Sequence, residues 1–149
     1  MGWRMFKHIL VPTDGSKLSM KAVSAAITFA QEVGAEVTLL AVTAPFHMLA
    51  SNSEEAEAAR LEHETNADRL CQQFLNQGAL KARQSGVLCE TVHVERDDIY
   101  RAIIDTANDR RCDLIAMASH GRRGLSAVLV GSVTIQVLSH SRIPVLVYR

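Results

Sequence analysis

Near its N-terminus the chain reads KHILVPTDGS over residues 7–16, and this stretch decides the fold. The apolar run at residues 8–11 is rich in β-branched side chains and stops at a cluster of turn formers, which predicts a buried strand with a sharp exit. Apolar residues then recur at helical spacing over residues 17–33. Ser16 is placed to cap this helix and Gly34 to end it, so we expect a strand, a turn and a helix in immediate succession.

The rest of the chain repeats this alternation of strand and helix. Further strands are expected at residues 37–43, 87–95, 113–118 and 144–148. Further helices are expected at residues 54–84, after a cap at Asp97 or Asp98, and at residues 132–139. Such alternation requires right-handed crossovers onto a parallel sheet. The predicted fold class is α/β, a doubly wound five-stranded parallel sheet with helices on both faces, in a single domain over residues 1–149.

The helix expected at residues 54–84 is long and mostly polar. We expect its apolar residues to form one stripe that faces the core. The members of this stripe are Ala58, Leu61, Leu70, Phe74, Leu75 and Ala82.

The composition bounds the classes of function. Sixteen basic and sixteen acidic side chains cancel, so no global field draws the chain to nucleic acid or to an anionic membrane. No run approaches the roughly 18 apolar residues that a membrane helix needs. The three cysteines, Cys71, Cys89 and Cys112, form no C-x-x-C pair. This pattern favours reduced thiols, packed in the core of a cytoplasmic protein, over a disulfide framework or a zinc site.

A ligand of a doubly wound sheet sits beyond the carboxyl ends of the strands, where the strand order reverses. The loops at residues 13–16 and 119–132 are therefore the first places to search. The second loop region begins with ASHGRRG at residues 118–124 and ends with GSVT at residues 131–134.

The parts of this second loop suit a phosphate group. Glycines let main-chain N–H groups approach an anion closely, and a helix N-terminus presents unpaired N–H donors with a favourable dipole. Ser132 and Thr134 add hydroxyl groups, while Arg122 and Arg123 add local positive charge. On the residues alone, however, tight turns and close helix packing explain the glycines as well as phosphate binding does.

Two better-known phosphate loops are missing from the sequence. The chain contains neither G-x-x-x-x-G-K-[ST] nor G-x-G-x-x-G. This disfavours both a P-loop NTPase and a dinucleotide-dependent dehydrogenase.

Three segments, taken together and in this order, resemble the universal stress protein family. Residues 7–16 resemble its opening strand and turn, and residues 141–147, SRIPVLV, resemble its closing segment. The loop between them resembles the family's nucleotide signature, which is a glycine, two residues, a second glycine, nine residues, and then glycine with serine or threonine. The resemblance covers nearly the whole chain and implies the strand order 3-2-1-4-5.

Placed on this chain, the signature has one departure. The second glycine is Gly121 and the final pair is Gly131-Ser132, whereas Ala118 stands where the family has its first glycine. If the backbone there needs left-handed angles, alanine costs on the order of 1 kcal/mol, and otherwise the change is nearly silent.

The resemblance implies an adenine nucleotide, ATP, with a divalent cation such as magnesium bound through its phosphates. Asp14 and Val42 should flank the adenosine, although Asp14 also fits a turn residue that accepts from the N–H of Ser16. No carboxylate cluster independently predicts a metal site. The expected binding residues are Pro12, Thr13, Asp14, Val42, Met117, Ala118, His120, Gly121, Arg122, Arg123, Gly131, Ser132, Val133 and Thr134.

The leading hypothesis is a stress-response module in which bound ATP biases a homodimer between states that bind a protein partner. The dimer is expected to pair through the apolar last strand, Val145-Leu146-Val147, because an uncovered strand edge invites a second copy. The enzymatic alternative is a slow ATP hydrolase or phosphotransferase that uses Asp14 or His120 to orient water. A third possibility is an interaction protein of the same fold that binds no nucleotide.

Overall fold

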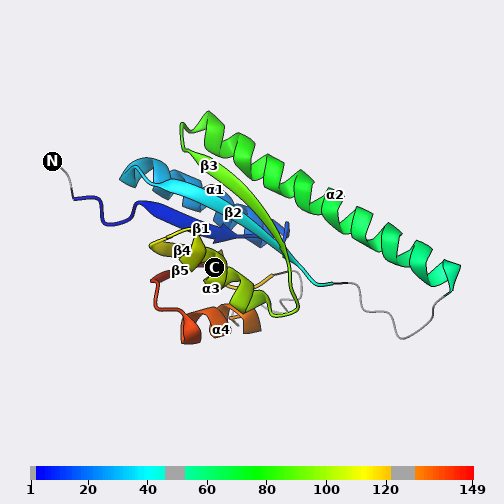
Figure 1. Ribbon diagram of the computed structural model, residues 1–149. Helices are drawn as coiled ribbons and strands as arrows, with labels where there is room; N and C mark the ends of the chain where they lie inside the picture. Colours follow the sequence, from blue (N-terminus) through cyan, green and yellow to red (C-terminus); the bar gives the residue numbers. More distant parts are fainter. Residues whose placement is uncertain (1–2, 46–52, 122–129) are drawn as a thin grey trace.

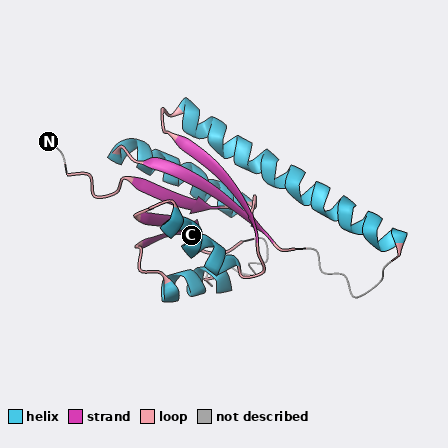
Figure 2. Cartoon of the chain, viewed as in Figure 1, coloured by secondary structure: helices cyan, strands magenta, loops and turns pink. Residues whose placement is uncertain are grey.

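The computed structural model of the chain describes residues 3–45, 53–121 and 130–149. Strands and helices alternate along these residues, as the sequence predicts (Figures 1 and 2). The elements are β1 (His8–Pro12), α1 (Lys17–Val33), β2 (Glu36–Thr43), α2 (Glu54–Gln84), β3 (Cys89–Glu95), α3 (Ile99–Asp109), β4 (Leu114–Ala118), α4 (Ser132–His140) and β5 (Val145–Tyr148).

The five strands form one parallel sheet in the order β3-β2-β1-β4-β5, which confirms the predicted fold class and strand order. Alternate side chains of β1 lie on opposite faces of this sheet. Ile9 and Val11 pack with α1 and α2, whereas Leu10 packs with α3 and α4. Because both faces are covered, the central strands read as continuous apolar runs rather than as alternating ones.

The ends of several elements differ slightly from the prediction, for local reasons. β4 begins at Leu114, one residue later than predicted, and the Asp113 carboxylate just before it accepts hydrogen bonds from the N–H groups of Lys7 and His8, at 2.9–3.1 Å. Asp98 is the N-cap residue of α3, which confirms the predicted position, but its side chain makes no capping bond. Its carboxylate lies 3.8 Å from Arg101 instead.

The helix α2 matches its predicted range, but the predicted apolar stripe is only partly right. Leu75 and Ala82 are buried and Phe74 is half-buried, whereas Ala58, Leu61 and Leu70 are exposed. A helix of 31 residues is about 46 Å long, roughly twice the length of the seven-residue β3 beside it. The N-terminal half of α2 therefore extends past the sheet, and its leucines have no core to enter (Figure 1).

The ends of α1 match the sequence prediction. The hydroxyl of Ser16 accepts a hydrogen bond from the N–H of Ser19 at 3.3 Å. Gly34 ends the helix with a left-handed φ of 71°, and its N–H donates to the carbonyl of Ala30. The Ser16 contact fixes where α1 begins after β1, and that junction forms one wall of the site described below.

The three cysteines are free thiols. Cys71 and Cys112 are buried, as expected, and Cys89 is partly buried. Among the described residues, no helix combines the length and the apolar character that crossing a bilayer requires.

Candidate functional site

A cavity opens where β1 and β4 separate. The pairing of these two strands ends at Leu10, which lies opposite Ile115. Beyond that level β1 continues beside β2 as far as Pro12, and β4 continues beside β5 as far as Ala118. The carboxyl ends of the two central strands therefore diverge at the point where the strand order reverses, and a cavity of about 140 Å³ lies between them.

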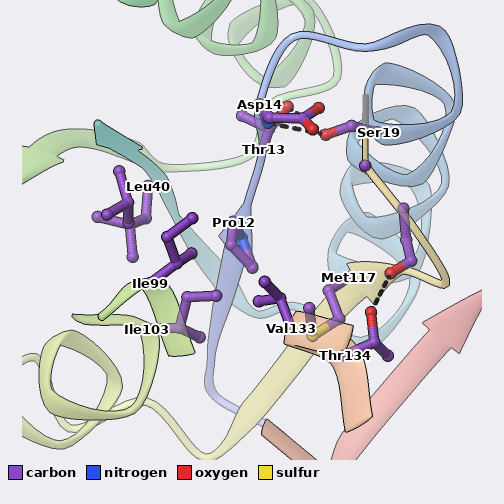
Figure 3. Close-up of a pocket in the computed structure, with 13 residues that line it drawn as sticks. Pro12, Thr13, Asp14, Ser19, Leu40, Ile99, Ile103, Met117, Val133 and Thr134 are labelled. Atoms are coloured by element: carbon purple, nitrogen blue, oxygen red, sulfur yellow. Dashed lines mark hydrogen bonds between the residues drawn. The ribbon is translucent and has the colours of Figure 1, made fainter. Parts of the chain in front are cut away.

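The lining of this cavity has an apolar part and a polar part (Figure 3). Strand ends, α3 and the first turn of α4 supply the apolar part, and the β1–α1 turn with Thr134 supplies most of the polar part. The apolar residues are Pro12, Leu40, Val42, Ile99, Ile103, Met117, Ala118 and Val133, and the others are Thr13, Asp14, Ser19, Gly121 and Thr134.

The β1–α1 turn is held by a compact hydrogen-bond network. The Oγ1 of Thr13 lies 2.5 Å from the Oγ of Ser19, and Ser19 Oγ accepts from the main-chain N–H of Asp14 at 3.2 Å. The Oδ1 of Asp14 accepts from the N–H of Ser16 at 2.9 Å. The turn interpretation of Asp14 is therefore confirmed, and the same bond fixes the carboxylate at the cavity.

Gly15, the next residue, needs to be glycine for two reasons. Its φ of 78° lies in the left-handed region, and a Cβ there would overlap the ring of Phe74 from α2. The turn that carries Asp14 is thus packed against a second helix as well as against α1.

The two described ends of the loop between β4 and α4 are joined directly. The N–H of Gly131 donates to the carbonyl of Ser119 at 2.6 Å. The hydroxyl of Thr134 lies 3.0 Å from the carbonyl oxygen of Ala118 and 3.2 Å from that of Ser119, and it donates to them. These bonds hold the N-terminus of α4 against the end of β4, beside the cavity.

Two glycines allow these close approaches. A Cβ at Gly131 would stand 3.2 Å from the Cα of His120 and from the carbonyl oxygen of Ser119. A Cβ at Gly121 would overlap the Oδ2 of Asp14, so the loop after β4 meets the turn after β1 at this point. Close packing is thus one reason for both glycines.

Ala118 carries no backbone strain. It is a buried strand residue paired with Tyr148, and Arg111 is the only non-glycine residue at positive φ among the described residues. The left-handed conformation that would penalise alanine is therefore not used at this position. Ala118 is nevertheless one of the residues that line the cavity.

Nine of the predicted binding residues line this cavity, from Pro12 on β1 to Thr134 on α4. His120, Gly131 and Ser132 adjoin it without lining it, and the Nδ1 of His120 lies 3.2 Å from the Oγ of Ser119. Arg122 and Arg123 lie outside the described residues. Within the described part of the chain, no three histidine, cysteine or acidic side chains gather in a way that could hold a metal ion.

Sequence reasoning missed four lining residues: Ser19, Leu40, Ile99 and Ile103. The sequence did hold a signal for Ile99 and Ile103. The helix α3 starts just past the carboxyl end of β3, so its first turns lie at the edge of the sheet where the cavity opens. Leu40 is paired opposite Pro12, a level that only the register reveals.

Comparison with known proteins agrees with this architecture. The family model described as "Universal stress protein family" matches residues 5–149. Universal stress protein MJ0531 of Methanocaldococcus jannaschii is 34% identical over 99% of this chain and 85% of its own length. Universal stress protein YxiE of Bacillus subtilis is 30% identical over 97% of this chain and 100% of its own. The solved structure of universal stress protein UspA from Lactobacillus plantarum has a TM-score of 0.83 at 25% identity, covering 99% of this chain and 100% of that one. On this evidence, the chain belongs to the universal stress protein family.

Proposed function

We propose that this chain binds an adenine nucleotide, ATP, in the cavity between β1 and β4. The observation that carries the proposal is the division of the lining into an apolar part and a polar part beside a helix N-terminus. A nucleotide has the same division, with a flat base at one end and hydroxyl and phosphate groups at the other.

The base belongs at the apolar part, between β2, α3 and Met117. The described side chains there offer no polar group to a base, so recognition falls to the main chain. The N–H of Thr13 donates to the carbonyl of Leu40 at 2.8 Å, and the pairing of β1 with β2 ends at that level. Val42 lies two residues on, so its N–H and C=O point to the same side, past the end of β1. With the base in one orientation, the Val42 C=O meets the amino group of adenine and the Val42 N–H meets its N1, whereas guanine in that orientation presents an acceptor to the acceptor and a donor to the donor.

The phosphates belong at the N-terminus of α4. The first N–H groups of a helix have no partner within it, and the dipole favours an anion. Gly131 is the N-cap residue, and because glycine has no side chain, no capping bond competes with a ligand there. The Thr134 hydroxyl already donates to main-chain carbonyls, so its main contribution is to hold α4 in place. Arg122, Arg123 and a magnesium ion held through the phosphates remain part of the proposal.

Two solved structures with this fold agree with the ligand class. One is a universal stress protein in complex with cAMP, at 23% identity, and the other is from Archaeoglobus fulgidus in complex with dAMP, at 17% identity. In each case the bound nucleotide is an observation on that protein and not on this chain. Both belong to the adenine series, which is the series proposed for this chain.

We further propose that the protein works in the cytoplasm as a homodimer in which the nucleotide biases partner binding. Leu146 on the edge strand β5 is 36% exposed, and Ile135 and Leu138 on the adjoining α4 are about half exposed. A second copy paired along β5 would cover Leu146 and satisfy the unpaired main-chain groups of the edge. Light scattering at micromolar concentration should report a dimer, and Leu146→Lys and Val147→Pro should each give a folded monomer. A monomeric wild type would contradict the dimer, and folded dimeric variants would place its interface elsewhere.

The hydrolase alternative gains no specific support from the described residues. His120 lies outside the lining, and one oxygen of Asp14 is engaged by the turn. We therefore retain binding as the function.

The direct test is the nucleotide content of freshly purified protein, released by acid and separated by chromatography. It should contain an adenine nucleotide, and calorimetric titration of nucleotide-free protein should give tighter binding of ATP than of GTP. Protein that carries no nucleotide and gives no heat with ATP, ADP or AMP would overturn the proposal.

A further inference from the structure

Ser19 occupies a special position beside the cavity. It is the third residue of α1, its side chain is almost completely buried, and it lines the cavity beside Thr13 and Asp14 (Figure 3). Its Oγ accepts a hydrogen bond from the main-chain N–H of Asp14 at 3.2 Å and lies 2.5 Å from the Oγ1 of Thr13. One hydroxyl group therefore joins both residues of the turn to the first turn of the helix.

The hydrogens of this network can all be placed within the protein. Thr13 Oγ1 accepts from the N–H of Gly15 at 3.2 Å and lies 3.5 Å from the sulfur of Met20. When Thr13 donates to that sulfur, Ser19 donates to Thr13, and both hydroxyl hydrogens have an acceptor. In this arrangement the Ser19 hydroxyl is turned toward the protein and holds the turn.

This network holds Asp14 in place. Its main-chain N–H is held by Ser19, and its Oδ1 is held by the N–H of Ser16 at 2.9 Å. Its Oδ2 faces Gly121 on the opposite wall, so close that a Cβ there would overlap it. The position of this negative charge at the cavity therefore depends on two anchors, the Ser19 hydroxyl at the backbone and the Ser16 N–H at the carboxylate.

We propose that Ser19 is a positioning residue of the nucleotide site and acts through Asp14. The inference rests on the proposed function, because it assigns to Ser19 the placing of a group that the nucleotide meets. Without the hydroxyl, the Asp14 N–H loses its acceptor and Thr13 loses its partner. The main-chain anchor of Asp14 is then lost, and the bond from the Ser16 N–H holds the carboxylate less precisely.

The first test compares Ser19→Ala with Ser24→Ala by calorimetric titration with ATP. Ser24 is a matched control because it lies on the same helix, in the groove between α1 and α2 and away from the cavity. Alanine favours the helix at both positions. Ser19→Ala should raise the Kd for ATP about three- to tenfold, the range expected for one lost hydrogen bond. Ser24→Ala should leave the Kd within about twofold of wild type.

A double-mutant cycle separates positioning from general loosening of the fold. If Ser19 acts through Asp14, then Ser19→Ala should change the Kd by less than about twofold in an Asp14→Ala background. A threefold or larger effect that is equal in both backgrounds would show that Ser19 acts by another route. An unchanged Kd for Ser19→Ala beside a normally binding wild type would also overturn the inference, while leaving the proposed function intact.

A third measurement needs no nucleotide. Amide hydrogen exchange followed by NMR should show faster exchange at the Asp14 N–H in Ser19→Ala than in wild type, with no change in Ser24→Ala. A wild type that binds no nucleotide would overturn the proposed function, and the binding role of Ser19 with it. Unchanged exchange at Asp14 would overturn the positional claim in every case.

Discussion

The substitution Gly131→Asp tests how the phosphate end of the cavity responds to an added negative charge, apart from the effect of an added side chain on the packing of the loop. A Cβ at this position would stand 3.2 Å from two main-chain atoms, so the loop must yield by a few tenths of an ångström. Aspartate is, however, a favoured N-cap residue, and its charge suits the helix dipole. We therefore expect the free energy of unfolding to change by no more than about 1 kcal/mol.

The effect of the same substitution on nucleotide binding should be much larger. A carboxylate about 5 Å from a phosphate costs about 3 kcal/mol at an effective dielectric constant near 20. That energy corresponds to a loss of affinity of more than about 100-fold. Gly131→Ala is the matched control, because it adds the Cβ without the charge and should weaken ATP binding by less than about tenfold.

Calorimetric titration with ATP, together with thermal denaturation, tests this reasoning. Folded Gly131→Asp that binds ATP with wild-type affinity would refute the placement of the phosphates at α4. Equal losses in Gly131→Ala and Gly131→Asp would show that steric fit, rather than charge, controls this end of the site.

Three other predictions follow from single features of the fold. Ala118→Gly should bind ATP at least as tightly as wild type in a calorimetric titration, because it removes the methyl group by which this lining residue departs from the family's signature. It should lower stability by about 0.5–1 kcal/mol because glycine is unfavourable within a strand. Weaker binding would show that the methyl contacts the ligand. Arg111→Gly should raise the stability measured by denaturant unfolding by about 1 kcal/mol, because Arg111 has a φ of 56°, whereas Arg110→Gly, at a φ of −88°, should give no gain. Burial raises the pKa of Cys89 to about 11 and that of Cys112 to about 12, from an ordinary value of 9.0. Their contribution to stability should therefore be complete below pH 9 and be lost as the pH rises through 11 and 12. Denaturant unfolding between pH 8 and pH 11 should show this decline, and it should be shallower when both cysteines are replaced by alanine.

The sequence predicted the elements well where periodicity and turn chemistry agree. The run at residues 8–11, the cap at Ser16 and the stop at Gly34 all lie where the pattern places them. The apolar stripe of α2 failed in its N-terminal half, because periodicity records which side of a helix is apolar and not where the sheet beneath it ends. Leu61 and Leu70 fit the helical spacing and are nevertheless exposed.

The candidate site was predictable in part for a similar reason. Glycines and hydroxyl residues after β1 and β4 identify the two loops, because such residues are typical of turns and anion sites. Leu40, Ile103 and Ser19 reach the cavity through strand register, helix packing and one buried hydrogen bond. These are tertiary relations that no short pattern encodes. The role of Thr134 changed likewise, since only the folded chain brings the Ala118 and Ser119 carbonyls to its hydroxyl.

The most direct test of the central claim is an NMR titration of the amide signals of the isotopically labelled protein with ATP. Binding in the cavity between β1 and β4 should shift the amides of Asp14, Val42, Gly121 and Gly131, which surround it. The amides of Gly34 and Gly86, in a separate hollow at the opposite end of the sheet, should stay in place and serve as the internal control. Saturable shifts centred on Gly34 and Gly86, or no shifts at millimolar ATP, would contradict the account.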